Sequence, residues 1–294
     1  MITLRQLRYL AAISETRHFG RAAQLCHVTQ PALSMQIQDL EESLDVQLVE
    51  RRRGSVSLTA AGTEIARKAT AILTAVADLE NYAGRERPVL TGLLRLGIIP
   101  SIAPYLLPRV LPELHRRHPG LELRIRETQT SALVEELARD DLDMILAALP
   151  LGRPDFDAVE AFEDRFLIAR QARQDRSASD RVDPTGIAGE QLLLLEEGHC
   201  LRDQALSVCG SLTPALSQAF ASSSLSTVMH LVANGYGITL LPEMAAEVEA
   251  TDRVQLVRFA APEPVRTIGL AWRRSSTRRA DAEALAGLLR EVRA

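Results

Sequence analysis

Apolar residues recur every three or four positions through about the first eighty residues, which is the spacing of amphipathic helices. The step from Leu33 to Ile37 and Leu40 is one such repeat. From Gly92 onward the pattern changes to short apolar runs, typical of buried strands, that alternate with helical segments. The sequence therefore predicts a helical first part and a larger second part of alternating strands and helices.

The second part predicts an α/β architecture with a largely parallel sheet, crossed twice by the chain so that two hinged lobes form. Ligands of such sheets bind at the carboxyl ends of the strands, where Ser101 and Thr130 offer hydroxyl groups. The expected strands are Leu93–Ile99, Leu121–Arg126, Leu142–Leu149, Leu192–Leu195, Ile238–Leu241 and Thr267–Trp272, and the expected helices are Pro104–His118, Ser131–Arg139, Leu201–Cys209, Leu225–Ala233 and Ala280–Val292.

The first sixty residues predict a winged helix–turn–helix. Thr29 is a good N-cap with Pro31 in the first turn, and the helix they start runs to about Leu44. A two-stranded wing is expected over Val46–Thr59. The competing interpretation is a helical packing domain with solvated arginines, but cap, proline, turn and wing occur in the order of the DNA-binding motif. The candidate DNA contacts are Thr29, Gln30, Pro31, Ser34, Gln36 and Gln38 on the helix, with Arg51, Arg52 and Arg53 on the wing.

A long helix is predicted from about Ala60 to Tyr82, capped by Thr59. Its apolar positions form a seam of about three heptads, adequate as a dimer brace. The alternative is one amphipathic helix that packs on its own domain. The seam consists of Ile65, Ala69, Ile72, Val76, Leu79 and Ala83.

Composition limits the function classes. The net charge of −4 means that DNA binding must come from a local basic patch. Three cysteines, an odd number, argue against a secreted disulfide scaffold and favour a reducing cytoplasm. We expect no signal peptide and no membrane-spanning segment. The sequence shows no phosphate-binding glycine motif and no Gly-x-Ser-x-Gly elbow. Cys26 has no second cysteine at ligand spacing, so we expect a buried structural thiol there and no metal site.

The segment from Leu192 to Cys209 carries the other two thiols. Cys200 is expected at a turn just before or at the start of a helix, where free N–H groups and the helix dipole favour the thiolate. His199 supplies a donor beside it, and Asp203 could cap the first turn or handle a proton. Across one helix, the Cα atoms of Cys200 and Cys209 would lie roughly 13 Å apart, whereas a disulfide needs them within about 7 Å. The pair is therefore a candidate switch that must refold to close, or simply two small buried side chains.

The stretch FGRAAQLCHVTQPALSMQIQDLEESLDVQLVER, followed by LTAAG, resembles the winged helix–turn–helix of LysR-type transcriptional regulators. The resemblance extends over the whole chain. It implies domains at 1–59 (DNA-binding), 60–88 (linker helix and hinge) and 89–294 (regulatory). The regulatory domain would resemble periplasmic binding proteins, with one lobe at about 89–164 and 267–294 and the other at about 165–266. The fold class as a whole is then α+β.

Within that family, GHCLRDQ with a second cysteine nine residues after the first is similar to the redox segment of members that sense hydrogen peroxide. The resemblance implies that Cys200 is the peroxide-reactive thiol and Cys209 the resolving one. Ser101 and Thr130 would hold peroxide and water, although a threonine is the expected residue at position 101. His199 and Asp203 would organise the reactive thiol. Residues 210–224 differ from the usual sequence of such sensors.

The resemblance also implies a homodimer or homotetramer on double-stranded DNA, activation through RNA polymerase, no cofactor, no membrane association and no enzymatic turnover. One alternative is a LysR-type regulator that binds a small organic metabolite between the lobes. Another is a thiol peroxidase, which the absence of a Cys-x-x-Cys motif and the presence of a DNA-binding domain disfavour.

Overall fold

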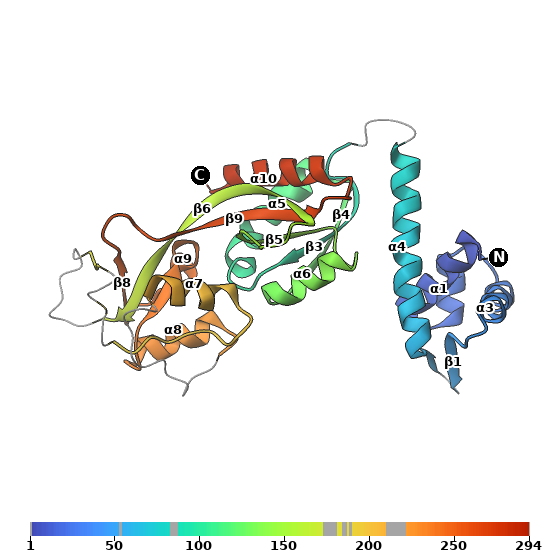
Figure 1. The fold of residues 1–294 in the computed structure, drawn as a ribbon, viewed down its shortest axis with the longest axis horizontal. Coiled ribbons are helices and arrows are strands. Elements are labelled where there is room, and N and C mark those ends of the chain that lie inside the picture. Colours follow the sequence, from blue (N-terminus) through green and yellow to red (C-terminus); the bar gives the residue numbers. More distant parts are fainter. Residues whose placement is uncertain are drawn as a thin grey trace. The chain divides into compact units, whose positions relative to one another are not determined.

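The computed structural model describes residues 2–52, 55–82, 88–172, 181–183, 187, 190–209 and 222–293, with the backbone alone at 51, 52, 55, 74, 77–82 and 209. The chain forms two compact units, Met1–Arg87 and Pro88–Ala294, and each is considered by itself (Figure 1). Among the helices described, none is both long and apolar enough to cross a bilayer.

The first unit has the elements that the sequence predicts. Leu33, Ile37 and Leu40 are completely buried on one face of the third helix, and Thr29 caps that helix by accepting a hydrogen bond from the Ala32 N–H at 3.4 Å. The helix–turn–helix and the two-stranded wing are therefore confirmed. The elements are α1 (Leu4–Thr16), α2 (Phe19–Leu25), α3 (Gln30–Leu44), β1 (Val49–Arg52), β2 (Ser55–Leu58) and α4 (Ala60–Tyr82).

One carboxylate ties α3 to the wing. Glu41 Oε1 accepts hydrogen bonds from the backbone N–H groups of Leu48 at 2.7 Å and Val49 at 3.0 Å. Leu48 and Val49 are themselves buried, so the bonds satisfy two donors that have left water. The start of β1 is thereby fixed to α3.

The long helix α4 divides its apolar seam between two environments. Thr59 caps it by accepting from the Gly62 N–H at 2.9 Å, as predicted. Ala66 and Ala69 are buried within the unit, where α4 lies along α1. Ile72, by contrast, is 46% exposed. The first half of the seam therefore packs on its own unit, and the dimer brace stays a prediction for the second half, where the side chain of Leu79 and residue Ala83 lie outside the description.

The second unit contains a seven-stranded sheet in which β4, β3, β5, β9, β6 and β7 follow one another and β8 also pairs with β6. The expectation of a largely parallel sheet is wrong. Of the strand pairs that the described residues form in this unit, β3–β4 and β3–β5 are parallel, and the other four are antiparallel. The long strand β6 leaves the first lobe and β9 returns antiparallel beside it. The strands are β3 (Gly92–Ile98), β4 (Leu121–Glu127), β5 (Met144–Leu149), β6 (Phe156–Gln171), β7 (Thr239–Pro242), β8 (Val254–Arg258) and β9 (Val265–Arg273).

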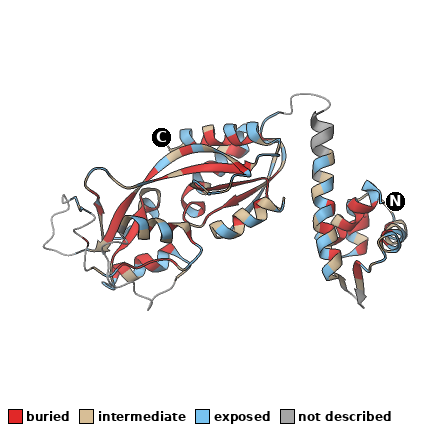
Figure 2. Cartoon of the chain, viewed as in Figure 1, coloured by how far each residue is buried: buried red, intermediate tan, exposed pale blue. Residues whose placement is uncertain are grey.

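Two hydrophobic cores define two lobes in this unit (Figure 2). Lobe I is built around Ile98, Ile145 and Leu270, and lobe II around Phe166 and Leu241. In lobe I, α5 and α10 cover one face of the sheet and α6 covers the other (Figure 1). The connection from β3 through α5 to β4 and the connection from β4 through α6 to β5 cross the sheet in opposite directions, so right-handed connections place α5 and α6 on opposite faces. The helices are α5 (Ala103–Arg117), α6 (Thr130–Ala138), α7 (Cys200–Cys209), α8 (Leu225–Ala233), η2 (Glu243–Ala245), α9 (Ala246–Glu249) and α10 (Arg279–Arg293).

The four leucines before the redox segment are buried, but they do not form a regular strand. Leu192 makes an isolated bridge to Ile238 and Leu195 makes one to Ser222. The apolar run thus correctly predicts that these leucines are buried, but the strand predicted over Leu192–Leu195 is wrong, because its residues form only isolated bridges. Strand β8 and the short helices η2 and α9 had no clear signal in the apolar pattern.

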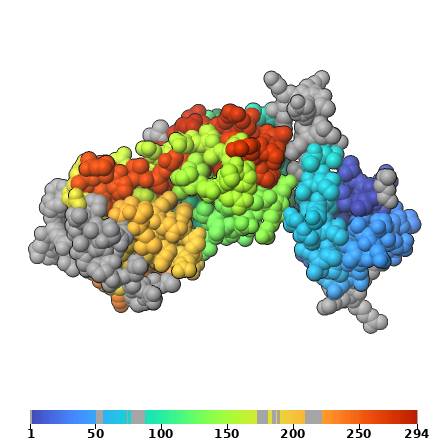
Figure 3. All heavy atoms as spheres, viewed as in Figure 1, coloured from blue at the N-terminus to red at the C-terminus, as the bar shows by residue number. Residues whose placement is uncertain are grey.

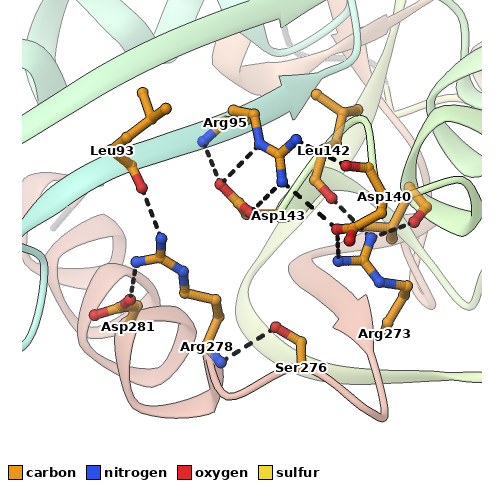
Figure 4. Close-up of polar contacts among 10 residues, drawn as sticks. Leu93, Arg95, Asp140, Leu142, Asp143, Arg273, Ser276, Arg278 and Asp281 are labelled. Carbon is orange, nitrogen blue, oxygen red and sulfur yellow. Dashed lines mark hydrogen bonds and ion pairs between the residues drawn. The ribbon is translucent and has the colours of Figure 1, made fainter. Parts of the chain in front are cut away.

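A buried network of arginines and aspartates stabilises one end of lobe I (Figure 4). Asp143 accepts from the backbone N–H of Arg95 at 2.7 Å and pairs with its guanidinium at 2.8 Å. Arg273 donates to the carbonyl of Leu142 at 2.9 Å and to the carboxylate of Asp140. Burial alone would raise the pKa of Asp143, but the hydrogen bond and charge of Arg95 outweigh it and lower that pKa.

The same network fixes the point where the chain enters lobe I. Asp281, at the start of α10, accepts from the buried backbone N–H of Leu90 at 2.7 Å. Its other oxygen lies 2.9 Å from Arg278, which donates in turn to the carbonyl of Leu93 at 2.7 Å (Figure 4). The entry of the chain is therefore tied to the C-terminal helix.

Replacing Asp143 with asparagine should reduce the free energy of unfolding at pH 7 by about 2 kcal/mol, because Arg95 loses its nearest carboxylate and keeps only the more distant Asp140 at 3.5 Å. The folded pKa of Asp143 is lowered, so its contribution is present above the unfolded pKa of about 3.9 and is lost as the pH falls through the folded value. The variant should therefore show a shallower loss of stability below about pH 4 than the parent. Urea unfolding at several pH values measures both effects.

Asp157→Asn is the matched control, because it breaks an exposed ion pair with Arg274. It should change the unfolding free energy only slightly at either pH. Equal losses in the two variants would contradict the structural role assigned to Asp143.

Candidate functional site

Cys200 lies at the boundary of the two lobes. It is the first residue of α7 and is partly exposed, and its side chain packs against the core of lobe I. Its neighbour Leu201 belongs to the core of lobe II, and His199 is only 5% exposed. A movement of α7 relative to lobe I would therefore change the surroundings of this thiol directly.

The turn before α7 is held against the start of α6. Gln129 donates from Nε2 to the carbonyl of Glu197 at 3.3 Å and to the carboxylate of Glu196 at 3.4 Å. Gly198 has φ +92°, and a Cβ atom there would lie 2.4 Å from Gln129 Oε1. Figure 3 shows the yellow-orange surface around α7 directly against the green surface of lobe I. The backbone conformation thus favours glycine at 198, and a larger residue would also displace the end of the Gln129 side chain.

Two buried polar atoms at this turn have no hydrogen-bond partner among the described residues. One is the hydroxyl oxygen of Thr130, the first residue of α6, and the other is His199 Nε2. The nearest charge to His199 Nε2 is the Glu196 carboxylate at 3.7 Å, beyond hydrogen-bond distance. Most buried polar groups of native proteins are paired, so each of these two atoms is a candidate hydrogen-bonding group for a small polar molecule.

Ser101 reaches the same edge of the sheet from the neighbouring strand. Ile98 and Glu127 are register partners in β3 and β4, and Ser101 and Thr130 each follow three residues later. Ser101 is 4% exposed and its hydroxyl oxygen accepts from Arg266 Nη1 at 2.9 Å. Its hydroxyl hydrogen therefore remains able to donate to another group.

Arg266 is a site residue that the sequence analysis missed. It pairs with Asp164 at 2.9 Å, and both side chains are almost completely buried where β6 and β9 run together. Asp164 also accepts from the Met244 N–H and from Arg293, both at 3.1 Å. The sequence does place a charged residue, Asp164 or Arg266, just before an apolar stretch of β6 and of β9. It does not show that these two residues face each other.

Among the described residues, no hydrogen bond or ion pair joins Arg202 or Asp203 to Cys200. Arg202 donates to the carbonyl of Leu195 at 3.0 Å. Asp203 is exposed on the first turn of α7, and within the described residues no hydrogen bond joins it to the predicted site. Cys209 ends α7, so the Cα atoms of the two cysteines lie roughly 13 Å apart at 1.5 Å per residue.

Cys26 lies far from this chemistry in sequence and in environment. It follows α2 and packs partly buried against the core of the first unit. Burial raises the pKa of the Cys26 thiol, and the nearby charge of Arg8 offsets only part of this. No group of metal-ligating side chains surrounds it among the residues that the structure describes.

The outer face of α3 is the predicted DNA-reading surface. Thr29, Gln30, Pro31 and Gln38 are exposed there, and Ser34 and Gln36 are partly exposed. Gln36 donates to Asp39 at 2.8 Å. Arg51 and Arg52 lie on β1 without described side chains, and Arg53 lies outside the described residues.

Both units match known families. Residues 4–63 match the family described as "Bacterial regulatory helix-turn-helix protein, lysR family". Residues 88–294 match the family described as "LysR substrate binding domain".

Relatives of similar length carry related names. The chain is 41% identical, over 99% of its length and 94% of the other, to a probable hydrogen peroxide-inducible genes activator of Streptomyces viridosporus. It is 40% identical, over 98% of its length and 95% of the other, to the DNA-binding transcriptional dual regulator OxyR of Escherichia coli K12. Full-length OxyR from Pseudomonas aeruginosa, solved as a variant, superimposes with a TM-score of 0.78 at 36% identity and covers 99% of this chain and 98% of its own.

Gly198→Ala should lower the melting temperature and slow alkylation of Cys200, because the added Cβ meets both an unfavourable φ and Gln129. Adding Gln129→Ala should remove the clash but not the backbone strain, and so recover part of each loss. Differential scanning fluorimetry and timed alkylation with mass mapping measure the two effects.

Gly152→Ala is the control for backbone strain without a steric contact. Gly152 also has a left-handed φ of +67°, and a Cβ atom there would meet nothing within 4 Å. It should cost stability and leave the Cys200 rate unchanged. A Cys200 rate that is equally slow in Gly152→Ala would contradict the local role of the turn.

Proposed function

Because the chain belongs to the LysR family of bacterial transcriptional regulators, we propose that it is a DNA-binding regulator that senses hydrogen peroxide through Cys200. The observation that carries this proposal is the position of that thiol. It begins a helix at the boundary of two lobes. Within the described part of the chain, the buried imidazole nitrogen of His199 beside it and the buried hydroxyl of Thr130 at the start of α6 have no hydrogen-bond partner. The peroxide-related names of relatives about 40% identical over nearly the full length support the same function.

The chemistry follows from the groups present. The Cys200 thiolate attacks one oxygen of hydrogen peroxide, the O–O bond breaks, and hydroxide leaves and is protonated to water while a sulfenic acid forms. The hydroxyls of Ser101 and Thr130 hold the peroxide by hydrogen bonds, and His199 supports the thiolate and the departing oxygen. Asp203, exposed on the first turn of α7, acts as an outer proton carrier.

The second step joins the two thiols. The sulfur of Cys209 attacks the sulfur of the Cys200 sulfenic acid, an S–S bond forms, and water leaves. In total one peroxide is reduced to two waters and two thiols are oxidised to one disulfide. Because α7 holds the cysteines roughly 13 Å apart and a disulfide needs about 7 Å or less, α7 must unwind and Cys200 must leave the core of lobe I.

The remaining parts transmit this change. The domain at 1–59 reads double-stranded DNA through α3 and the wing, and the linker and hinge at 60–88 brace a dimer. Two dimers form a tetramer, and the regulatory domain at 89–294 controls contact with RNA polymerase. The protein works in the cytoplasm and consumes peroxide only once per reduction, so it is a sensor and not an enzyme.

Thiol trapping is the principal test. Reduced full-length protein is given one equivalent of hydrogen peroxide, quenched with an alkylating reagent and mapped by peptide mass. We expect a rapid Cys200–Cys209 disulfide. Cys26 should stay unoxidised and so remain available for alkylation, because its raised pKa disfavours the thiolate that attacks peroxide. Cys200→Ser should abolish the peroxide-dependent change in the DNA footprint while DNA binding persists.

Cys26→Ser serves as the control and should respond to peroxide as the parent does. If Cys200→Ser keeps a normal peroxide response, the proposal is wrong. The site between the lobes would then be better assigned to an organic metabolite.

Thr130→Val should slow the oxidation of Cys200 by at least about tenfold, because it removes a donor to the developing charge. It should leave the unfolding free energy unchanged or slightly higher, since the hydroxyl that is lost has no described partner. Competition kinetics with a peroxide probe and urea unfolding separate the two effects.

Ser101→Ala provides the contrast. It should slow oxidation and also destabilise the protein by about 1–3 kcal/mol, because Arg266 loses an acceptor in a buried site. Faster or unchanged oxidation in both variants would remove the two hydroxyls from the mechanism.

A further inference from the structure

We propose that Met35 is a base-reading residue that selects thymine, through contact of its thioether side chain with the thymine 5-methyl group in the major groove. This inference rests on the proposed DNA-binding function and goes beyond it, because it assigns a base preference to one side chain. It follows from the exposure of Met35, its place on α3 and the charge around it.

Met35 is 57% exposed, the largest value among the large apolar side chains described in the first unit. At about 100° per residue, Met35 is separated from both Leu33 and Ile37 by about 160° around the helix axis, measured along the shorter arc. Both of those residues are completely buried. Met35 therefore lies at the centre of the outward face of α3, opposite the core.

Charge decides which half of that face meets DNA. Beyond Gln38 the helix carries Asp39 and Glu42, and Asp45 caps its C-terminal end; phosphates would repel all three carboxylates. From Thr29 to Gln38 the helix has no charged residue. Helices of this motif contact base edges with their N-terminal residues, and Met35 belongs to that uncharged half.

The chemistry of the side chain then identifies the base. Methionine has no donor and only a weak acceptor, so it cannot read the hydrogen-bonding pattern of a base edge. In the major groove thymine alone presents a methyl group, and apolar side chains select it by contact. An unbranched thioether with three rotatable bonds can reach such a methyl over a range of helix positions. Gln38, on the same outward face, is left to make polar contacts.

The test uses the full-length chain and a duplex selected by this chain from randomised DNA. Each thymine is replaced in turn by uracil, which removes one methyl and keeps the base-pairing edge. We expect one position in each half-site where the replacement weakens binding about fourfold, the effect of losing about one buried methyl. Fluorescence anisotropy at constant salt measures the thymine-to-uracil ratio of dissociation constants.

Met35→Ala should bring that ratio close to one at the same position, whereas Met35→Leu should keep most of it. Both substitutions are at an exposed position, so the fold is retained, and circular dichroism checks this. Leu25→Ala is the matched control, because Leu25 is 55% exposed on α2, outside α3, and its truncation should leave the ratio unchanged.

Two outcomes overturn the inference. One is a parent protein that binds all uracil duplexes as tightly as the thymine duplex, and the other is a ratio that persists in Met35→Ala. Failure to select any preferred duplex is a different result, since it contradicts the proposed function itself and this inference with it.

Discussion

The buried ion pair between Arg266 and Asp164 determines how the second unit can work. It lies where β6 and β9 pass between the lobes, and it also engages Ser101 of lobe I and Met244 of lobe II. Two charges so deeply buried are tolerated only when paired and hydrogen-bonded, and removal of one partner typically costs about 3–5 kcal/mol. The strands that join the lobes are therefore a stable frame, and a redox response has to come from a segment outside it.

Segment 196–209 fits that requirement because its attachments are weaker. Its side-chain contacts to Gln129 are 3.3–3.4 Å long and lie near the surface. Cys200 packs against the core of lobe I, while the next residue, Leu201, belongs to the core of lobe II. Local stability differs across proteins, and the elements that move are drawn from the less stable end. The frame around Arg266 and the segment that carries Cys200 thus differ in how firmly they are held, as the proposed refolding of α7 requires.

The sequence predicts most of the elements and less of their assembly. Thr29 and Pro31 mark the start of α3 because capping is local, and helix bounds such as Leu225–Ala233 follow from apolar spacing. The antiparallel pairing of β6 with β9 joins residues about a hundred positions apart, and periodicity holds no information about such partners. The same limit hides Arg266, whose importance depends on burial against Asp164. Nor does the sequence show that Arg202, two residues after Cys200, donates to the carbonyl of Leu195.

The bonds from Glu41 to the start of the wing have a consequence for how the first unit meets DNA. A groove-reading helix and a phosphate-contacting hairpin that moved independently would each lose orientational freedom on binding. Joined through one carboxylate, they act as a single rigid body, so that docking of the helix already places the wing. The second contact then adds affinity at little further entropic cost, in the manner of a bivalent ligand with a rigid linker.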